Sequence, residues 1–119
     1  MRLMLENLPP SLRAQTETLR QCLEAFDKVM PLQAVYLFGS HARGDARPDS
    51  DVDLCLVSEG AERQFEAAAL FRHVMWGIWP RPAFTLVPIA PKRLSEKRAR
   101  GDHFFRTVLE EGVQLGSAN

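Results

Sequence analysis

Apolar and polar positions change period several times along the chain, and each period predicts a different element. From Ser11 to Met30 the apolar residues recur every three or four positions, which predicts a helix that Ser11 can cap and Pro31 ends. Residues 33–38 (QAVYLF) and 52–57 (VDLCLV) are short apolar runs that predict two strands. Because side chains alternate between the faces of a strand, the second run has an aliphatic face and a face with Asp and Cys.

The second half of the chain continues this alternation. Residues 61–79 are rich in Ala, Glu, Arg, Leu and Phe and predict a helix, whereas residues 83–89 (AFTLVPI) predict a third strand. Pro91 can open a further helix, and Asp102 can cap a last helix that ends at Gly112.

The predicted order is helix, strand, strand, helix, strand, helix, helix. It indicates an α/β or α+β fold in which flanking helices cover a small mixed sheet. Residues 116–119 are expected to form a tail. The length of 119 residues suits a single domain over 1–119, and 45% apolar and 25% charged residues are ordinary globular values. Disordered, collagen-like and low-complexity classes are therefore excluded.

Charge and cysteine content narrow the functional classes. The 15 Lys and Arg balance 15 Asp and Glu, so a general nucleic-acid or membrane-surface binder is not expected. Twelve of the cations are arginines, which suit forked recognition of phosphate or carboxylate. No apolar stretch has the length of a membrane span, and residues 1–10 lack the apolar region of a secretory signal. Cys22 and Cys55 form no framework, so we expect a cytoplasmic protein with reduced, buried thiols.

The segment 37–56 (LFGSHARGDARPDSDVDLCL) carries the candidate chemistry. Its first strand ends at Gly39 and Ser40, where glycine lets a phosphate come close to the backbone and serine adds a hydroxyl. A helical turn after them would offer free N–H groups to an anion. Arg43 can reach the same anion, or it can pair with a surface acid.

Two aspartates follow at the start of the second strand. Asp51 and Asp53 stand two positions apart, so their carboxylates project from the same face. Two such carboxylates suit Mg²⁺, which keeps waters and takes its remaining ligands from phosphates. A phosphate-binding turn beside a magnesium site is typical of nucleotidyl transfer. We interpret Asp45 and Asp49 as surface residues and Ser50 as a hydrogen-bonding residue that orders the loop.

Other features have more ordinary interpretations. His41 could approach a nucleotide, but an exposed loop histidine is the commoner case. The basic run 92–100 is interpreted as a solvated helix face, with a contact for triphosphate, RNA or an acidic partner as the alternative. Residues 75–79 (MWGIW) are apolar all round and indicate a partner surface, unless they form a buried helix end. The large aromatic residues of this region are mostly assigned to the core: Trp76, Trp79, Phe65, Phe71 and Phe84.

The stretch GSHARGDARPDSDVDL resembles the signature of the minimal nucleotidyltransferase (MNT) domain of the DNA polymerase β-like superfamily. That signature is Gly-Ser, about ten residues, then Asp-x-Asp. The resemblance extends from about residue 33 to residue 115, with a motif core at 33–90, and the closing FFRTVLEEGVQL resembles the family's last helix. It implies the nucleotidyltransferase palm fold.

The resemblance also implies residue roles and a partner. Gly39, Ser40 and Arg43 would bind the nucleotide, and Asp51 and Asp53 would bind magnesium and serve catalysis. Small stand-alone members resemble antitoxins that are paired with a HEPN-domain ribonuclease toxin and transfer AMP to a tyrosine on it. ATP and Mg²⁺ are therefore the implied substrate and cofactor, a HEPN-type toxin is the implied partner, and a homo-oligomer stays open.

One position departs from the family pattern. The family has a third carboxylate on the next strand, where this chain has Thr85, and residues 83–90 contain no acid. A threonine offers a neutral oxygen but cannot act as a base at neutral pH. Two alternatives therefore remain. One is a binding-only antitoxin that neutralises its toxin through apolar residues near Trp76 and Trp79; the other is a small-molecule nucleotidyltransferase whose acceptor site another subunit completes.

Overall fold

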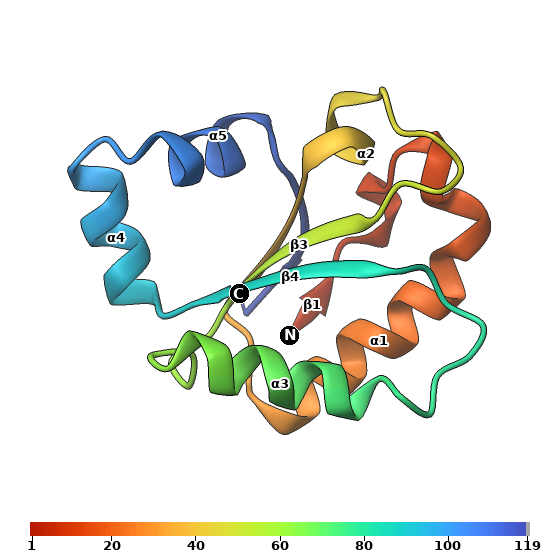
Figure 1. Ribbon diagram of the computed structural model, residues 1–119, viewed down its shortest axis with the longest axis horizontal. Helices are drawn as coiled ribbons and strands as arrows, with labels where there is room; N and C mark the ends of the chain where they lie inside the picture. Colours follow the sequence, from red (N-terminus) through yellow and green to blue (C-terminus); the bar gives the residue numbers. More distant parts are fainter. Residues whose placement is uncertain (119) are drawn as a thin grey trace.

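The computed structural model describes residues 1–118 and contains a mixed five-stranded sheet with helices on both faces (Figure 1). The strands lie in the spatial order β1 (Arg2–Leu3), β5 (Val113–Ser117), β2 (Ala34–Phe38), β3 (Val52–Val57) and β4 (Phe84–Ile89). Strands β3 and β4 are parallel, and the other neighbouring pairs are antiparallel. The prediction of a small mixed sheet with flanking helices is confirmed.

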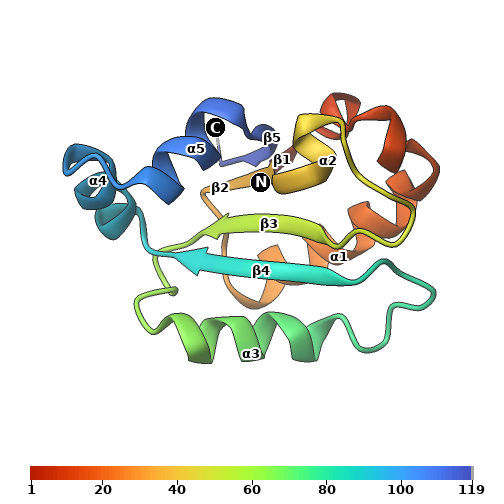
Figure 2. The same ribbon diagram turned by 45° about the horizontal axis from the view of Figure 1, so that its top comes forward.

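The helices form two layers (Figure 2). Helices α1 (Thr16–Val29) and α3 (Gln64–Val74) cover one face of the sheet, and α4 (Pro91–Ala99) and α5 (His103–Glu111) lie over the other. The short helix α2 (Gly39–Arg43) continues directly from the end of β2, and two 3-10 helices, η1 (Leu5–Asn7) and η2 (Pro10–Gln15), precede α1. Within residues 1–118, no helix combines the length and apolar character that crossing a membrane requires.

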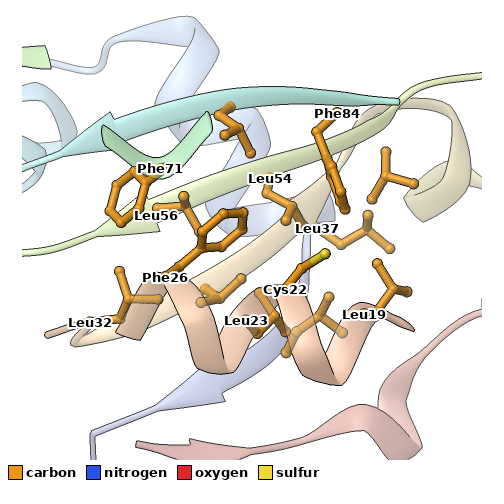
Figure 3. Packing of buried hydrophobic residues seen from close by; sticks show 14 of the residues in the cluster. Leu19, Cys22, Leu23, Phe26, Leu32, Leu37, Leu54, Leu56, Phe71 and Phe84 are labelled. Carbon is orange, nitrogen blue, oxygen red and sulfur yellow. The ribbon is translucent and has the colours of Figure 1, made fainter. Parts of the chain in front are cut away.

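Most of the hydrophobic core lies between the sheet and the α1–α3 layer (Figure 3). Phe26 of α1 is fully buried and packs edge-to-face against Phe71 of α3 and Phe84 of β4, with ring centroids 5.3 and 6.4 Å apart. The even-numbered residues of β3 enter this core. A smaller buried cluster occupies the opposite face: Cys55, Val57, Ile89, Phe105 and Val108. Two faces of the same sheet are therefore filled to different extents.

The C-terminal strand corrects the predicted order. Gly116 and Ser117 were expected in a tail, but they belong to β5, which pairs with β1 on one side and β2 on the other. The remainder of the expected tail is Ala118, outside any strand, and residue 119, which lies outside the described residues. The segment VQLGS has weak strand character of its own and is held by neighbours distant in sequence. A Cβ at Gly116 would press against the Met1 side chain, so the small residue fits this packing.

Helix boundaries differ from the predicted ones in two places. The helix expected from Ser11 divides into η2 and α1. Ser11 lies inside η2 and so does not cap α1, and its Oγ lies 2.8 Å from His41 Nδ1. The helix expected over 61–79 is shorter and covers only α3. The last helix agrees with the prediction: Asp102 caps α5 by accepting a hydrogen bond of 3.1 Å from the Phe105 N–H, and Gly112 follows its end.

Candidate functional site

Gly39 connects β2 to α2 and contacts the second aspartate of the motif. Its φ of +76° lies in the left-handed region that glycine adopts without strain. A Cβ at this position would overlap Asp53 Oδ2, so the absence of a side chain lets the backbone approach the carboxylate. Both the turn and the close approach therefore require glycine at this position.

The two aspartates and Thr85 form one cluster on adjacent strands. Asp53 lies opposite Phe38 of β2 on one side and opposite Thr85 of β4 on the other. Thr85 Oγ1 donates a hydrogen bond of 3.1 Å to Asp51 Oδ2. Asp51 is exposed and Asp53 is half-buried. The sheet register thus places Thr85 directly beside both carboxylates, where the family pattern has its third acid.

The surroundings of Asp53 disfavour its charged form. Burial, the largest cause, raises the pKa of Asp53 above its ordinary value, and the negative charge of Asp51 acts in the same direction. Hydrogen bonding of Asp53 with Thr85 opposes this rise in pKa, as do the electrostatic interactions of Asp53 with His41 and Arg43. A cation placed between two neighbouring carboxylates neutralises both, so this pair is suited to bind one.

The donor set suits a hard divalent cation that is completed by other ligands. Among residues 1–118, no cluster of three or more His, Cys, Asp and Glu side chains could hold a metal ion. The site instead offers the carboxylates of Asp51 and Asp53 and the hydroxyl of Thr85. Two carboxylates leave room for waters and phosphate oxygens, which is the coordination that Mg²⁺ favours. The residues therefore fit magnesium held jointly by the protein and a nucleotide.

A pocket of about 490 Å³ opens beside Asp53. Three of the predicted nucleotide-site residues, Gly39, Ser40 and Arg43, line it together with Asp53. Arg43 also lies 3.5 Å from Asp45 in an exposed ion pair, a contact that contributes little energy in water. The arginine therefore has both of its expected environments and remains available to an anion. Asp51 is not among the residues that line this pocket.

The opposite wall of the pocket comes from α5, and sequence reasoning did not identify it. Its lining side chains are His103, Phe104, Thr107, Val108 and Glu111. Most of them recur at three- and four-residue spacing, so they form one helix face. That spacing was visible in the sequence, but only the placement of α5 over β2 directs it toward the motif.

His41 is buried, contrary to the expectation of an exposed loop residue. It is 5% exposed, with Nδ1 2.8 Å from Ser11 Oγ and Nε2 3.4 Å from the Ser50 carbonyl oxygen. Ser50 Oγ accepts a hydrogen bond of 2.8 Å from the Arg47 N–H, which confirms that Ser50 orders the loop. These contacts hold the loop between α2 and β3 against η2. His41 itself does not line the pocket beside Asp53.

A larger cavity of about 730 Å³ lies between η2, the motif loop and the segment before β4. It is lined by polar residues that include Arg47, Asp49 and Arg81, but by neither Asp51 nor Asp53. The smaller pocket is the better candidate for chemistry despite its size, because it alone combines the Gly-Ser turn with a carboxylate of the pair.

The remaining sequence candidates lie away from the pocket beside Asp53. Helix α4 has no buried residue, so the basic run that continues to Arg100 is a solvated face, as expected. Phe71 and Phe84 are buried as predicted. Phe65 is 94% exposed, so its assignment to the core is wrong. Trp76 and Trp79 are 78% and 80% exposed, so their assignment to the core is also wrong, and a buried helix end is ruled out.

The fold is that of known nucleotidyltransferase structures. A crystal structure from Sulfolobus solfataricus, described as a "putative nucleotidyltransferase", superposes with a TM-score of 0.59 and 21% sequence identity, covering 86% of this chain and 79% of that one. The family model for the nucleotidyltransferase domain matches residues 17–115, and the chain belongs to this family. No curated protein matches the chain. Membership of the family indicates general nucleotidyl transfer from a nucleotide substrate.

Proposed function

We propose that the protein is a magnesium-dependent nucleotidyltransferase that transfers AMP from ATP to a hydroxyl of a partner protein. The observation that carries the proposal is that the Gly39–Ser40 turn and Asp53 line one pocket, with Gly39 against Asp53 and with Asp51 joined to the site through Thr85. In the proposal Gly39 and Ser40 hold the β- and γ-phosphates, Arg43 offsets their charge, and Asp51 and Asp53 hold magnesium. When bound, the magnesium supplies charge neutralisation at the phosphates.

The proposed reaction is an in-line displacement. The acceptor oxygen forms a bond to the α-phosphorus, and the bond from that phosphorus to the β-phosphate oxygen breaks. Pyrophosphate leaves with the bonding electron pair. Thr85 is neutral and its hydroxyl is already donated to Asp51, so it does not accept the acceptor's proton. Because Asp51 and Thr85 are exposed, we assign that proton to solvent water.

The proposed partner is a HEPN-type toxin in the cytoplasm. The resemblance of the motif to that of stand-alone antitoxins supports this choice. Two exposed aromatic residues that follow α3, Trp76 and Trp79, also favour a protein partner, since large exposed apolar side chains are typical of interaction sites. They belong to the α3 side of the sheet, so a partner could bind there without filling the pocket.

A second candidate is a binding-only antitoxin. It is favoured by Thr85, which pairs with Asp53 in the sheet, and by the exposed side chains of Trp76 and Trp79. In this alternative the protein keeps the fold and neutralises the toxin by complex formation. A small-molecule nucleotidyltransferase is a third possibility, and it differs only in the acceptor.

The test uses ATP labelled at the α-phosphate, magnesium and an extract of the source cells. Wild type is compared with Asp53→Ala and with Asp49→Ala, which removes an exposed carboxylate of the same loop outside the pair. Labelled protein with wild type and Asp49→Ala, but not with Asp53→Ala, supports the enzyme and its protein acceptor. Equal labelling with Asp53→Ala contradicts the assigned site. Absence of label in all three, with intact antitoxin action by Asp53→Ala, supports the binding-only alternative.

A further inference from the structure

The α5 wall of the pocket presents one partly exposed aromatic ring. Phe104 is 42% exposed and lines the pocket beside Asp53. It is held by two edge-to-face contacts, with Phe38 at 5.4 Å and 86° and with Phe105 at 5.0 Å and 85°. An aromatic ring fixed by its neighbours while remaining open to a cavity loses little freedom when a flat ligand stacks on it.

A carboxylate lies two helical turns further along the same face. Glu111 is exposed and lines the pocket with Phe104 and Thr107, and seven residues of helix span roughly 10 Å along the axis. The end of α5 that carries Glu111 adjoins β2, because Val113 pairs with Leu37 just before the Gly39 turn. The wall therefore presents a carboxylate and an aromatic ring, both near the end of β2: Glu111 precedes the pairing of Val113 with Leu37, and Phe104 packs on Phe38.

The chemical groups that line the pocket match the parts of a nucleotide. Ser40, Arg43 and Asp53 are suited to phosphates and their cation, and an ionised carboxylate only accepts hydrogen bonds. A ribose offers two adjacent hydroxyl donors between the phosphates and the base, and every base offers a flat face for stacking. A pocket of about 490 Å³ is within the usual range for a small-molecule ligand.

We infer that α5 is the nucleoside-binding wall, in which Phe104 stacks on the base and Glu111 accepts hydrogen bonds from the ribose hydroxyls. The inference rests on the proposed nucleotidyltransferase function and adds the residues that recognise the nucleoside part of the substrate. It selects ribonucleotides over deoxyribonucleotides through Glu111. It also selects purines over pyrimidines through Phe104, because the larger ring system covers more of the phenyl face.

The test measures binding by calorimetry with magnesium and four probes: ATP, UTP, 2′-deoxy-ATP and inorganic tripolyphosphate. Phe104→Ala is paired with Phe65→Ala, which removes an exposed phenylalanine outside the pocket. Glu111→Gln is paired with Glu110→Gln, its exposed neighbour that does not line the pocket. Phe104→Tyr keeps the ring and is expected to keep ATP binding.

Phe104→Ala is expected to weaken ATP binding by about 5- to 150-fold and to reduce the preference for ATP over UTP, with tripolyphosphate binding unchanged. Glu111→Gln is expected to lower the preference for ATP over 2′-deoxy-ATP by roughly tenfold or more. The two paired variants should bind like wild type. Unchanged tripolyphosphate binding also verifies that each variant is folded.

Three results would overturn the inference. The first is ATP binding by Phe104→Ala equal to that of Phe65→Ala, and the second is an equal loss of ATP and tripolyphosphate in Phe104→Ala. The third is that the wild-type protein binds tripolyphosphate but shows no preference among ATP, UTP and 2′-deoxy-ATP. That result would contradict the nucleoside-binding wall and would still agree with the proposed phosphate site. If wild type binds none of the four probes, the proposed function itself fails together with the inference.

Discussion

The two faces of the sheet are built from the same strands but perform different tasks. On the α1–α3 face, the residues of β3 and β4 enter a large core around Phe26. On the α5 face, the buried cluster is small, and Asp53 and Thr85 are placed side by side where it ends. The comparison teaches that one strand, β3, can supply the large core at even positions, while its odd positions supply Asp53 to the site and Cys55 and Val57 to the smaller cluster. Substitutions on the two faces should therefore have separable effects.

The largest effect is expected on the packed face, from Phe26→Ala. Phe26 is fully buried and contacts two other phenylalanines, so its removal leaves a cavity among rigid neighbours. We expect the free energy of unfolding to fall by about 3–5 kcal/mol in urea titrations. A loss below about 1 kcal/mol would mean that this face is not the main stabilising core.

The opposite behaviour is expected of Asp53→Asn. Removing one charge from the pair should lower nucleotidyl transfer by about 100- to 1,000-fold, the range found when one charge-stabilising group is lost. The free energy of unfolding should not decrease, because burial disfavours the charged form of Asp53 and raises its pKa, whereas asparagine carries no charge. Radiolabel transfer and urea unfolding measure the two effects. A large destabilisation with normal transfer would reverse the comparison between the faces.

Gly39→Ala links the two properties. The left-handed φ and the overlap with Asp53 Oδ2 should cost about 1–3 kcal/mol of stability and displace the carboxylate. The matched control is Gly77→Ala, because a Cβ at Gly77 meets no atom within 4 Å and Gly77 has no positive φ. Thermal unfolding and transfer assays of both variants test this. Equal behaviour of the two would show that Gly39 does not need to be small.

In metal-free protein, we expect a smaller effect of pH on the free energy of unfolding, and it should arise from Asp53 on the α5 face. Burial raises the pKa of Asp53, so the folded state holds that proton more strongly than the unfolded state does. The contribution of Asp53 to stability is then fully present below its ordinary pKa and is lost as pH rises through the raised value. In EDTA, the unfolding free energy of wild type relative to Asp53→Asn should decline across that window. A rise in the same window would contradict burial as the main cause.

The smallest stability effect is expected outside both faces, from Trp79→Ala. Trp79 is 80% exposed, so the free energy of unfolding should change by no more than about 0.5 kcal/mol. A binding-only antitoxin would nevertheless lose toxin neutralisation in Trp79→Ala and keep it in Asp53→Asn. Growth rescue in cells that carry the toxin measures this, and the reverse result would favour the enzyme.

Local patterns predicted most of the elements that carry the site. The strand expected at residues 52–57 is β3 with the same bounds, and the Asp102 cap and the end of α5 at Gly112 were also readable from the sequence. Each depends on neighbours in the chain, such as strand alternation or the free N–H groups at a helix start. The turn at Gly39 was also expected, but its close approach to Asp53 depends on the pairing of β2 with β3.

The rest depends on contacts between distant residues. The burial of His41 requires Ser11, 30 positions earlier, and β5 requires partners in β1 and β2. The nucleoside wall of α5 depends on the chain returning over β2 after α4. The local pattern of apolar and polar residues does not encode these long-range pairings. The sequence therefore identified the residues but could not predict which of them come together.

The position of β5 between β1 and β2 has a consequence for the order of events during synthesis. Strand β2 leads directly into the Gly39 turn, and one of its two edges is covered only by residues 113–117. A nascent chain that has not yet released this segment from the ribosome has β2 as an open edge and α5 undocked. We therefore expect a ribosome-bound chain to acquire its pocket only once residues 113–117 have emerged, after strands β1 to β4 have been made.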